Sequence, residues 1–214
     1  MTETPPTNPV FNAAGGSLPP RSETAAVIVD VQLGCVKFMG REDARNYLTH
    51  LGETIEDMRS RNIPVNWVVI GREDTLFPPS RDATSEPYAH DELADIGFFQ
   101  LDPRREGDGI EENQDIFEEF IAAHGPRRNE TILAKRNFNA FENDLLADRL
   151  VEGGTKNILT MGLVGSVCAL ETAIGGVQRR FNTNLLLDNV ACWGGPRERY
   201  DEIAPLVWRD GYSS

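Results

Sequence analysis

Three residues of the sequence carry side chains that together could hydrolyse a carbonyl compound. Asp30 ends the apolar run TAAVIVD, Lys135 ends the run ETILAK, and Cys168 lies at the start of a predicted helix. A thiol is a nucleophile, a neighbouring carboxylate can take its proton, and a cation stabilises the anions that form. The dipole of the helix is expected to lower the pKa of the thiol. Singly, such residues are more often a helix cap, a solvated lysine and a packed small side chain, but together they are the parts of a thiol hydrolase.

The surrounding pattern predicts the elements that must bring the three residues together. Short apolar runs typical of buried parallel strands alternate with stretches whose apolar residues recur every three or four positions, as in helices. The predicted strands are residues 24–30, 64–70, 130–135, 156–162 and 183–188, and the predicted helices are residues 42–61, 142–152, a helix from near residue 166, and residues 197–208. This alternation predicts an α/β fold of three layers (α/β/α) with a doubly wound, mainly parallel, Rossmann-like sheet of five to six strands. The carboxyl ends of such strands share one edge of the sheet, where ligands bind.

The length of the chain, 214 residues, is that of one ordinary domain. Residues 1–22, rich in Pro, Thr, Asn and Gly, are expected to form a flexible N-terminal arm, and residues 23–214 a single domain. Residues 71–113 are too long for a routine connection and are predicted to be a lid or an interface insertion. Within them, the GFF sequence of Gly97–Phe99 is the segment expected at a contact with another subunit.

The composition excludes several classes of partner. A formal net charge of −13 disfavours nucleic acid and anionic membrane surfaces, because a negative field repels phosphate. An odd count of 3 cysteines favours reduced thiols and a cytoplasmic protein. No apolar run approaches the roughly 20 residues that a membrane helix needs. Since His50, His90 and His124 are far apart, no metal or other cofactor is expected, and the expected ligand is a small-molecule substrate.

Four segments closely resemble the isochorismatase-like cysteine hydrolase superfamily. They are the DVQ of Asp30–Gln32, the KRNFNAF of Lys135–Phe141, the GLVGSVCALETA of Gly162–Ala173, and the LLLDNVA that ends at Ala191. The superfamily includes nicotinamidases, carbamoylsarcosine amidases, ureidoacrylate and biuret hydrolases, and isochorismatases. The resemblance implies a catalytic triad of Asp30, Lys135 and Cys168 and an oxyanion hole formed by the backbone N–H groups of Val164 and Cys168. It further implies a cis peptide bond between Leu163 and Val164, and a homo-oligomer, a dimer or higher.

The sequence departs from the metal-dependent nicotinamidases of this superfamily, which carry an Asp and paired histidines beyond the second strand. The corresponding segment here is GREDTLFPPS, without histidine, so a metal-independent enzyme is expected. Cys35 is expected to be an inert core thiol, and Trp67 a core residue. The candidate substrate-binding residues are Gln32, Phe38, Arg72, Phe141 and Trp193.

These observations predict a metal-independent cysteine hydrolase that cleaves a C–N bond of a small carbamoyl, ureido or carboxamide substrate through a thioester. Two alternatives remain open: an isochorismatase, which hydrolyses the vinyl ether of isochorismate, and a catalytically inactive interaction protein with the same fold. An intact Cys168 in an intact surrounding motif favours amide chemistry. Acidic residues at the rim of the pocket would slightly favour a neutral amide or ureide over doubly charged isochorismate.

Overall fold

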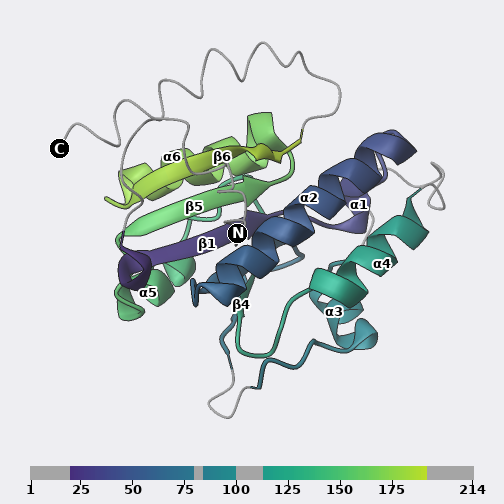
Figure 1. Cartoon of the computed structure of the whole chain (residues 1–214). Coiled ribbons are helices and arrows are strands. Elements are labelled where there is room, and N and C mark those ends of the chain that lie inside the picture. The colour runs from purple at the N-terminus through teal and green to yellow at the C-terminus, as the bar shows by residue number, and fades with distance from the viewer. Residues whose placement is uncertain (1–19, 80–83, 100–112, 192–214) are drawn as a thin grey trace, which may run out of the picture.

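The computed structural model of the chain describes residues 20–79, 84–99 and 113–191. Residues 1–19 of the expected N-terminal arm, the expected helix at residues 197–208, and Trp193 lie outside these ranges. Within them, the predicted three-layer α/β/α fold is confirmed, with a mainly parallel sheet between two layers of helices (Figure 1).

The sheet has six strands in the described ranges. In chain order they are β1 (Thr24–Val29), β2 (Val65–Ile70), β3 (Thr75–Phe77), β4 (Thr131–Lys135), β5 (Asn157–Gly162) and β6 (Asn182–Val190). Their order across the sheet is β3-β4-β2-β1-β5-β6, and all neighbours are parallel except β3, which runs antiparallel to β4 at one edge. Each predicted strand is present with bounds that differ by at most two residues, while β3 was not predicted.

The apolar composition of the central strands follows from their burial on both faces. Every residue of β1 is buried: Ala26 and Ile28 pack on one side of the sheet, and Ala25, Val27 and Val29 on the other. Parallel strands covered by helices on both faces have no solvated side, so an unbroken run such as AAVIV is what this position requires. The run ends where the strand reaches the edge at which Asp30 lies.

The helices divide between the two faces of the sheet. In chain order they are α1 (Leu33–Val36), α2 (Arg41–Ser60), α3 (His90–Ile96), α4 (Gln114–His124), α5 (Leu145–Glu152) and α6 (Leu170–Gln178), with a short turn, η3 (Gly165–Ala169), directly before α6. The first four pack against one core cluster, and α5 and α6 against the other (Figure 1). Each strand–helix–strand crossover thus covers one face, as in other doubly wound sheets.

Helix α2 shows why the apolar periodicity of the sequence predicted a helix correctly. Leu48, Leu51, Ile55 and Met58 recur at helical spacing and are all buried, which gives one apolar stripe against the sheet. The helix stops where Asn62 adopts a left-handed conformation, with a φ of 57°. Pro64 then prevents continuation and leads into β2.

The segment between β2 and β4 contains more regular structure than the sequence analysis predicted. Helix α4 was missed, although Ile116, Phe117, Phe120 and Ile121 form its buried face. Phe98 is completely buried, with its ring 5.9 Å from that of Trp67. The prediction that the GFF segment lies at a subunit contact is therefore wrong for Phe98, because this ring is already used by the core of its own chain.

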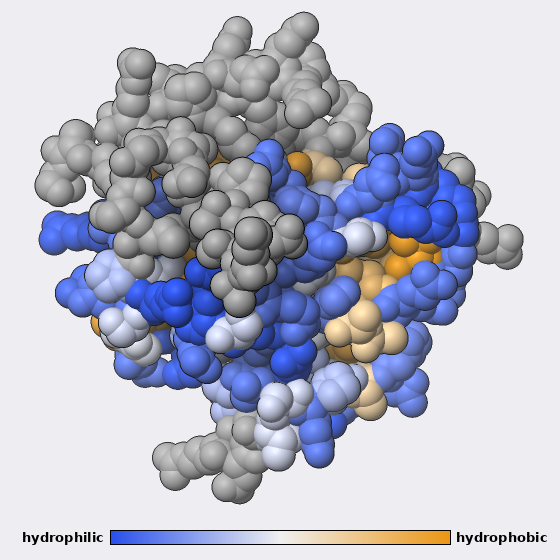
Figure 2. All heavy atoms as spheres, viewed as in Figure 1, coloured by the Kyte–Doolittle hydropathy of each residue, from blue (hydrophilic) through white to orange (hydrophobic). Residues whose placement is uncertain are grey.

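The face seen in Figure 2 is hydrophilic over most of α2, and hydrophobic residues show mainly between α2 and α4. Among the described helices, none is both long and apolar enough to cross a membrane. In the part of the chain that the structure describes, the exposed large hydrophobic side chains are Phe138, Leu145 and Val151.

Candidate active site

The ends of β4, β1 and β5 bring three chemically active side chains to one edge of the sheet. The chain passes from β1 to strands on one side of it and returns later to β5 on the other side, so the strand order reverses between β1 and β5. Asp30 directly follows β1, Lys135 is the last residue of β4, and Cys168 lies in η3 just after β5. The three residues thus lie at the switch point of the sheet, where parallel α/β folds bind ligands.

Asp30 is held in an unusual backbone conformation. Its φ is 50°, in the left-handed region, and its side chain is fully buried. Its N–H donates to Val68 O at 2.7 Å, and its carbonyl accepts from Gln32 N at 2.9 Å. Asp is one of the few residues with a side chain that tolerate this region, and such conformations cluster at functional sites.

Lys135 reaches the carboxylate of Asp30 across the end of β2, which lies between their strands. Its Nζ donates to Asp30 Oδ2 at 2.9 Å and to Asn137 O at 2.8 Å. The side chains of Lys135 and Asp30 are only 2% and 0% exposed. A buried ammonium needs such partners, because neither charge is stabilised by bulk water here.

Cys168 is buried in a single π-helical turn at the start of α6. Val167 N and Ala169 N both donate to Val164 O, at 2.9 Å and 3.2 Å, which fixes the turn. The sulfur interacts with the Asp30 carboxylate and with the backbone N–H of Val164. Such turns are rare and occur frequently at functional sites.

The electrostatics of the site differ from the sequence-based expectation. Burial raises the pKa of Asp30 despite the opposing effects of Lys135 and the Cys168 thiol. Burial, and then the negative charge of Asp30, raise the pKa of Cys168 well above its ordinary value. The net shift of the thiol pKa is therefore opposite in direction to the one expected from the helix dipole. Desolvation and a neighbouring carboxylate outweigh the dipole, so the resting sulfur keeps its proton.

The loop before η3 presents the backbone N–H of Val164 to the sulfur. The peptide bond between Leu163 and Val164 is cis, at the position that the resemblance implied. Gly162 has a φ of 120°, and a Cβ there would lie 2.1 Å from Val29 O, so this close approach to β1 requires glycine. Gly165 N donates to Ala191 O at 2.9 Å, which ties the loop to the end of β6.

Comparison with known proteins decides the family. The family model of the isochorismatase domain matches residues 24–202. The chain belongs to the isochorismatase family. The match spans all six strands and the three residues at the switch point. As a member, the chain is a hydrolase of the isochorismatase-like superfamily.

Solved structures share the fold of this family member. A cysteine hydrolase from Pseudomonas syringae is 19% identical, with a TM-score of 0.53 over 90% of this chain and 95% of the other. An isochorismatase from Pseudomonas putida is 17% identical, with a TM-score of 0.55 over 92% and 91%. A nicotinamidase from Staphylococcus aureus is 15% identical, with a TM-score of 0.52 over 88% and 95%. A search of curated proteins returned no match.

The structure gives Gln32 a different environment from that of a substrate-binding residue. Its Nε2 donates to Ile70 O at 3.1 Å and to Gly97 O at 2.7 Å, and its Oε1 accepts from Ile70 N at 2.7 Å. Both amide N–H groups are thus used, and the side chain is buried. In this isochorismatase-family chain, Gln32 joins the ends of β1 and β2 to the loop after α3.

Phe141 is a buried core residue in the cluster that also contains Cys168. Its ring is 5.8 Å from that of Phe181, and it faces Gly176 in the second half of α6. Its predicted contact with substrate stays a prediction. Trp67 is a core residue as predicted, and its Nε1 donates to Glu130 Oε2 at 2.8 Å.

Two other predicted substrate contacts lie at the edge that carries the candidate active site. Phe38 follows α1 and is half-buried, with the ammonium of Lys37 4.9 Å from its ring centre. Arg72 is exposed on the loop after β2. On the same loop, Asp74 is engaged by Arg136, whose backbone N–H donates to Asp74 Oδ1 at 2.9 Å. In the described residues, no group of three or more His, Cys, Asp or Glu side chains could hold a metal ion.

Sequence reasoning missed several residues that shape the site. The Asn137 carbonyl binds Lys135, and the Thr172 hydroxyl accepts from Ala140 N at 3.2 Å, which ties this loop to α6 four residues after Cys168. A backbone acceptor has no signature in sequence. Lys37 was also missed, although a lysine within the apolar segment LGCVKFM was a visible signal.

Proposed function

We propose that this chain is a metal-independent cysteine hydrolase that cleaves a C–N bond of a small carbamoyl, ureido or carboxamide substrate through a thioester. The observation that carries the proposal is the contact of Cys168 with a buried Asp30–Lys135 ion pair at the switch point. A buried thiol beside a carboxylate of raised pKa is suited to transferring its proton when a substrate arrives, rather than to being a permanent thiolate.

In the first half-reaction, Asp30 takes the proton of Cys168 while the sulfur attacks the substrate carbonyl carbon. The carbonyl oxygen becomes an oxyanion that accepts hydrogen bonds from the N–H groups of Val164 and Cys168, a kind of contact typically worth about 3 kcal/mol in the transition state. The C–N bond then breaks, and Asp30 returns its proton to the leaving amine. The product of this half-reaction is a thioester on Cys168.

In the second half-reaction, water replaces the amine. Asp30 takes a proton from water, whose oxygen attacks the thioester carbon, and the C–S bond breaks with return of a proton to the sulfur. Lys135 keeps the net charge small throughout, because its positive charge offsets either the Asp30 carboxylate or, once Asp30 is protonated, the negative charge that has moved to the substrate oxyanion. The raised pKa values of Asp30 and Cys168 therefore support one shared proton between them.

The experiment is a hydrolysis panel of nicotinamide, biuret, ureidoacrylate, carbamoylsarcosine and isochorismate, with wild-type protein and Cys168→Ala after dialysis against EDTA. We expect amine or ammonia from at least one amide or ureide with wild type only, and a mass increase on Cys168 after rapid acid quenching. Residual turnover by Cys168→Ala contradicts the covalent mechanism. Cleavage of isochorismate that survives this substitution identifies the vinyl-ether alternative, and inactivity on every compound favours the inactive scaffold.

Two further proposals concern the state of the protein. We propose a cytoplasmic location, supported by the odd number of cysteines, and a homo-oligomer, supported by the family resemblance. Light scattering on purified protein tests the second: a mass equal to that of one chain contradicts it.

A further inference from the structure

We propose that Lys37 binds a carboxylate of the substrate, so that the substrate is an amide or ureido acid carrying a single negative charge. This inference rests on the proposed function, since it names the class of compound that the same site takes. It begins from two buried polar atoms on one short segment, Asp30 Oδ1 and Lys37 Nζ, that have no hydrogen-bond partner of ordinary geometry among the described residues.

Among the described residues, none is a counter-ion for the buried Lys37. It ends the single turn of α1 and is only 7% exposed, yet its Nζ has no hydrogen-bond partner in the described structure. The neighbouring Phe38 ring gives the charge a weak electrostatic contact at 4.9 Å. The nearby carbonyls of Val36 and Met39 are taken, because Asn113 Nδ2 donates to both, at 3.2 Å and 2.9 Å. Asn113 Oδ1, on the same amide, is also buried without a partner, but a neutral amide oxygen does not balance the charge of an ammonium. Lys37 in this state therefore still requires an anion, which the described residues do not supply.

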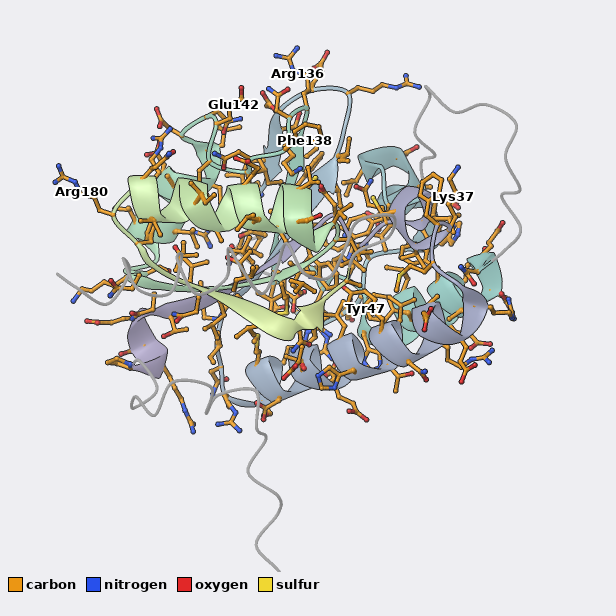
Figure 3. All side chains as sticks on the ribbon, turned by 90° about the horizontal axis from the view of Figure 1, so that it is seen from above. Lys37, Tyr47, Arg136, Phe138, Glu142 and Arg180 are labelled. Atoms are coloured by element: carbon orange, nitrogen blue, oxygen red, sulfur yellow. The ribbon has the colours of Figure 1, made fainter. Side chains whose placement is uncertain are left out.

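The position of Lys37 connects it with the active edge of the sheet. Helix α1 begins directly after the Asp30–Gln32 turn, and Lys37 N donates to Leu33 O at 3.0 Å. One turn of helix thus separates Lys37 from the segment that carries Asp30. Gly34, one turn before Lys37 on the same helical face, has no side chain to stand between them. Figure 3 shows Lys37 and Arg180, which precedes β6, on opposite sides of the molecule.

The unpaired oxygen of Asp30 is complementary to the unpaired ammonium of Lys37. Asp30 Oδ2 is bound by Lys135, but the buried Oδ1 has no hydrogen-bond partner of ordinary geometry among the described residues. Asp30 therefore offers an acceptor and Lys37 a donor. A ligand with an amide N–H at one end and a carboxylate at the other satisfies both.

The summed charge of the buried residues narrows the class of ligand further. Asp30 and Lys135 neutralise each other, so Lys37 leaves the buried part of the site with one positive charge in excess. A monovalent carboxylate balances this charge, whereas a doubly charged compound leaves one negative charge without a counter-ion. The overall acidity of the chain therefore does not exclude an anionic substrate, because the local charge at Lys37 has the opposite sign.

The test measures binding separately from turnover. In a Cys168→Ala background, we use N-carbamoylglycine as the acid probe and N-carbamoylglycinamide as its neutral counterpart, with calorimetry or ligand-observed NMR as the readout. The acid is expected to bind at least tenfold more tightly than the amide. Lys37→Met should weaken the acid by about 10- to 100-fold and leave the amide unchanged, as expected for one charge-assisted hydrogen bond. Lys156→Met, which removes an exposed lysine at the opposite end of β5, is the matched control and should change neither.

Stability of the free protein gives an independent readout. Because Lys37 has no partner, Lys37→Met should raise the thermal midpoint of the ligand-free protein, and the acid probe should raise the midpoint of the parent but not of this variant. A fall in the ligand-free midpoint shows that the chain itself pairs Lys37 and overturns the proposal. Equal weakening of the acid and the amide, or no preference for the acid in the parent, overturns it as well. Lys37→Arg, which keeps a cation, should retain part of the preference.

Failure of this inference differs from failure of the proposed function. If the panel shows Cys168-dependent hydrolysis but Lys37→Met changes the KM of acids and amides alike, only the inference fails. If no compound is hydrolysed while the acid still binds through Lys37, only the proposed function fails.

Discussion

Two buried ion pairs lie at opposite ends of the strands of the sheet, and their roles differ. The pair Asp30–Lys135 lies at the carboxyl ends of the strands, and the pair Arg59–Glu130 lies at the amino ends, where β4 begins. The side chains of the first pair are 0% and 2% exposed and those of the second 8% and 6%, so burial does not distinguish them. What distinguishes them is how completely their hydrogen bonds are made.

The Arg59–Glu130 pair is fully satisfied. The Arg59 guanidinium donates to both Glu130 oxygens, to Glu56, and to the carbonyls of His124 and Gly125. Glu130 Oε2 also accepts from Trp67 Nε1 and from Arg127 N. Burial alone would lower the pKa of Arg59, but Glu130 and Glu56 raise it. Such a network joins α2, the end of α4 and the start of β4, and it leaves no group free to react.

The Asp30–Lys135 pair is incomplete by comparison. One Asp30 oxygen has no ordinary hydrogen bond, and the thiol beside the carboxylate retains its proton. The contrast shows that a buried ion pair stabilises a fold when every lone pair and proton is used. When one is left unused, the pair can instead accept a proton or a ligand.

The largest effect is expected from removing the charge of Asp30. Asp30→Asn should reduce turnover by about a thousandfold or more, because the proton acceptor is lost. The same change should speed alkylation of Cys168 by iodoacetamide, since the Asp30 charge and hydrogen bond raise the pKa of this thiol. Initial rates and mass spectrometry measure both effects. Slower or unchanged alkylation would mean that Asp30 does not control the protonation of the sulfur.

At the other pair, the effect should fall on stability rather than turnover. Glu130→Gln leaves the buried guanidinium of Arg59 with only the partly exposed Glu56 as a counter-ion and should cost about 3–5 kcal/mol of unfolding free energy. Turnover per folded molecule should remain within about twofold, because the network lies at the opposite edge. Urea unfolding with activity measured in parallel checks this, with the exposed Glu53→Gln as control. A large loss of turnover in the folded protein would contradict the division of roles.

Lys135→Met tests whether the reactive pair adapts by protonation. Asp30, whose pKa is already above its ordinary 3.8, should then take up a proton more readily. A carboxyl with a raised folded-state pKa contributes stability that is present below its unfolded pKa and is lost as pH rises through the folded value. As pH rises from about 4, the variant should therefore lose more unfolding free energy in total than wild type. The difference should be about 1.4 kcal/mol for each unit by which the substitution raises the folded-state pKa of Asp30. Parallel curves of stability against pH would disprove adaptation by protonation.

The smallest effect is expected from a pair at the surface. Arg41 and Asp115 join the starts of α2 and α4, and their contact lowers the pKa of Asp115 to about 2. Their side chains are 46% and 56% exposed, so water and salt screen the attraction. Arg41→Ala should shift the thermal midpoint by no more than about 1 °C. A shift as large as that of Glu130→Gln would show that burial is not what separates these pairs.

The parts of the fold that sequence predicted are those with an unambiguous pattern. The central strands are apolar throughout because both faces are covered, and α2 has a long apolar stripe and clear stop signals. Helix α4 was missed because its apolar residues occur as adjacent pairs, Ile116–Phe117 and Phe120–Ile121, in a stretch directly after the predicted insertion of residues 71–113 to which no element was assigned. The spacing of these pairs nevertheless indicates a helix, since positions i, i+1, i+4 and i+5 lie on one helical face.

The environments of the site residues were harder to predict than their places along the chain. Motifs placed Asp30, Lys135 and Cys168 at one edge, but the pKa of the thiol depends on desolvation and on a carboxylate 138 positions away in sequence. Gln32 looked like a polar group available to substrate, yet backbone groups of Ile70 in β2 and Gly97 after α3 use its amide. Lys37 stands out in the sequence as a lysine within an apolar segment, but only the structure shows that its ammonium is buried and has no partner among the described residues.

The reach of Lys135 across β2 makes the candidate site sensitive to strand register. Ile70 of β2 pairs with Lys135, while Val29 of β1 pairs with Val68 of β2 on one side and with Gly162 on the other. Side chains alternate between the two faces of a strand, so a slip of β4 by one residue would replace Lys135 beside Asp30 with a neighbour of different size or charge. An activity measurement on this chain would therefore also report whether its four central strands have paired correctly.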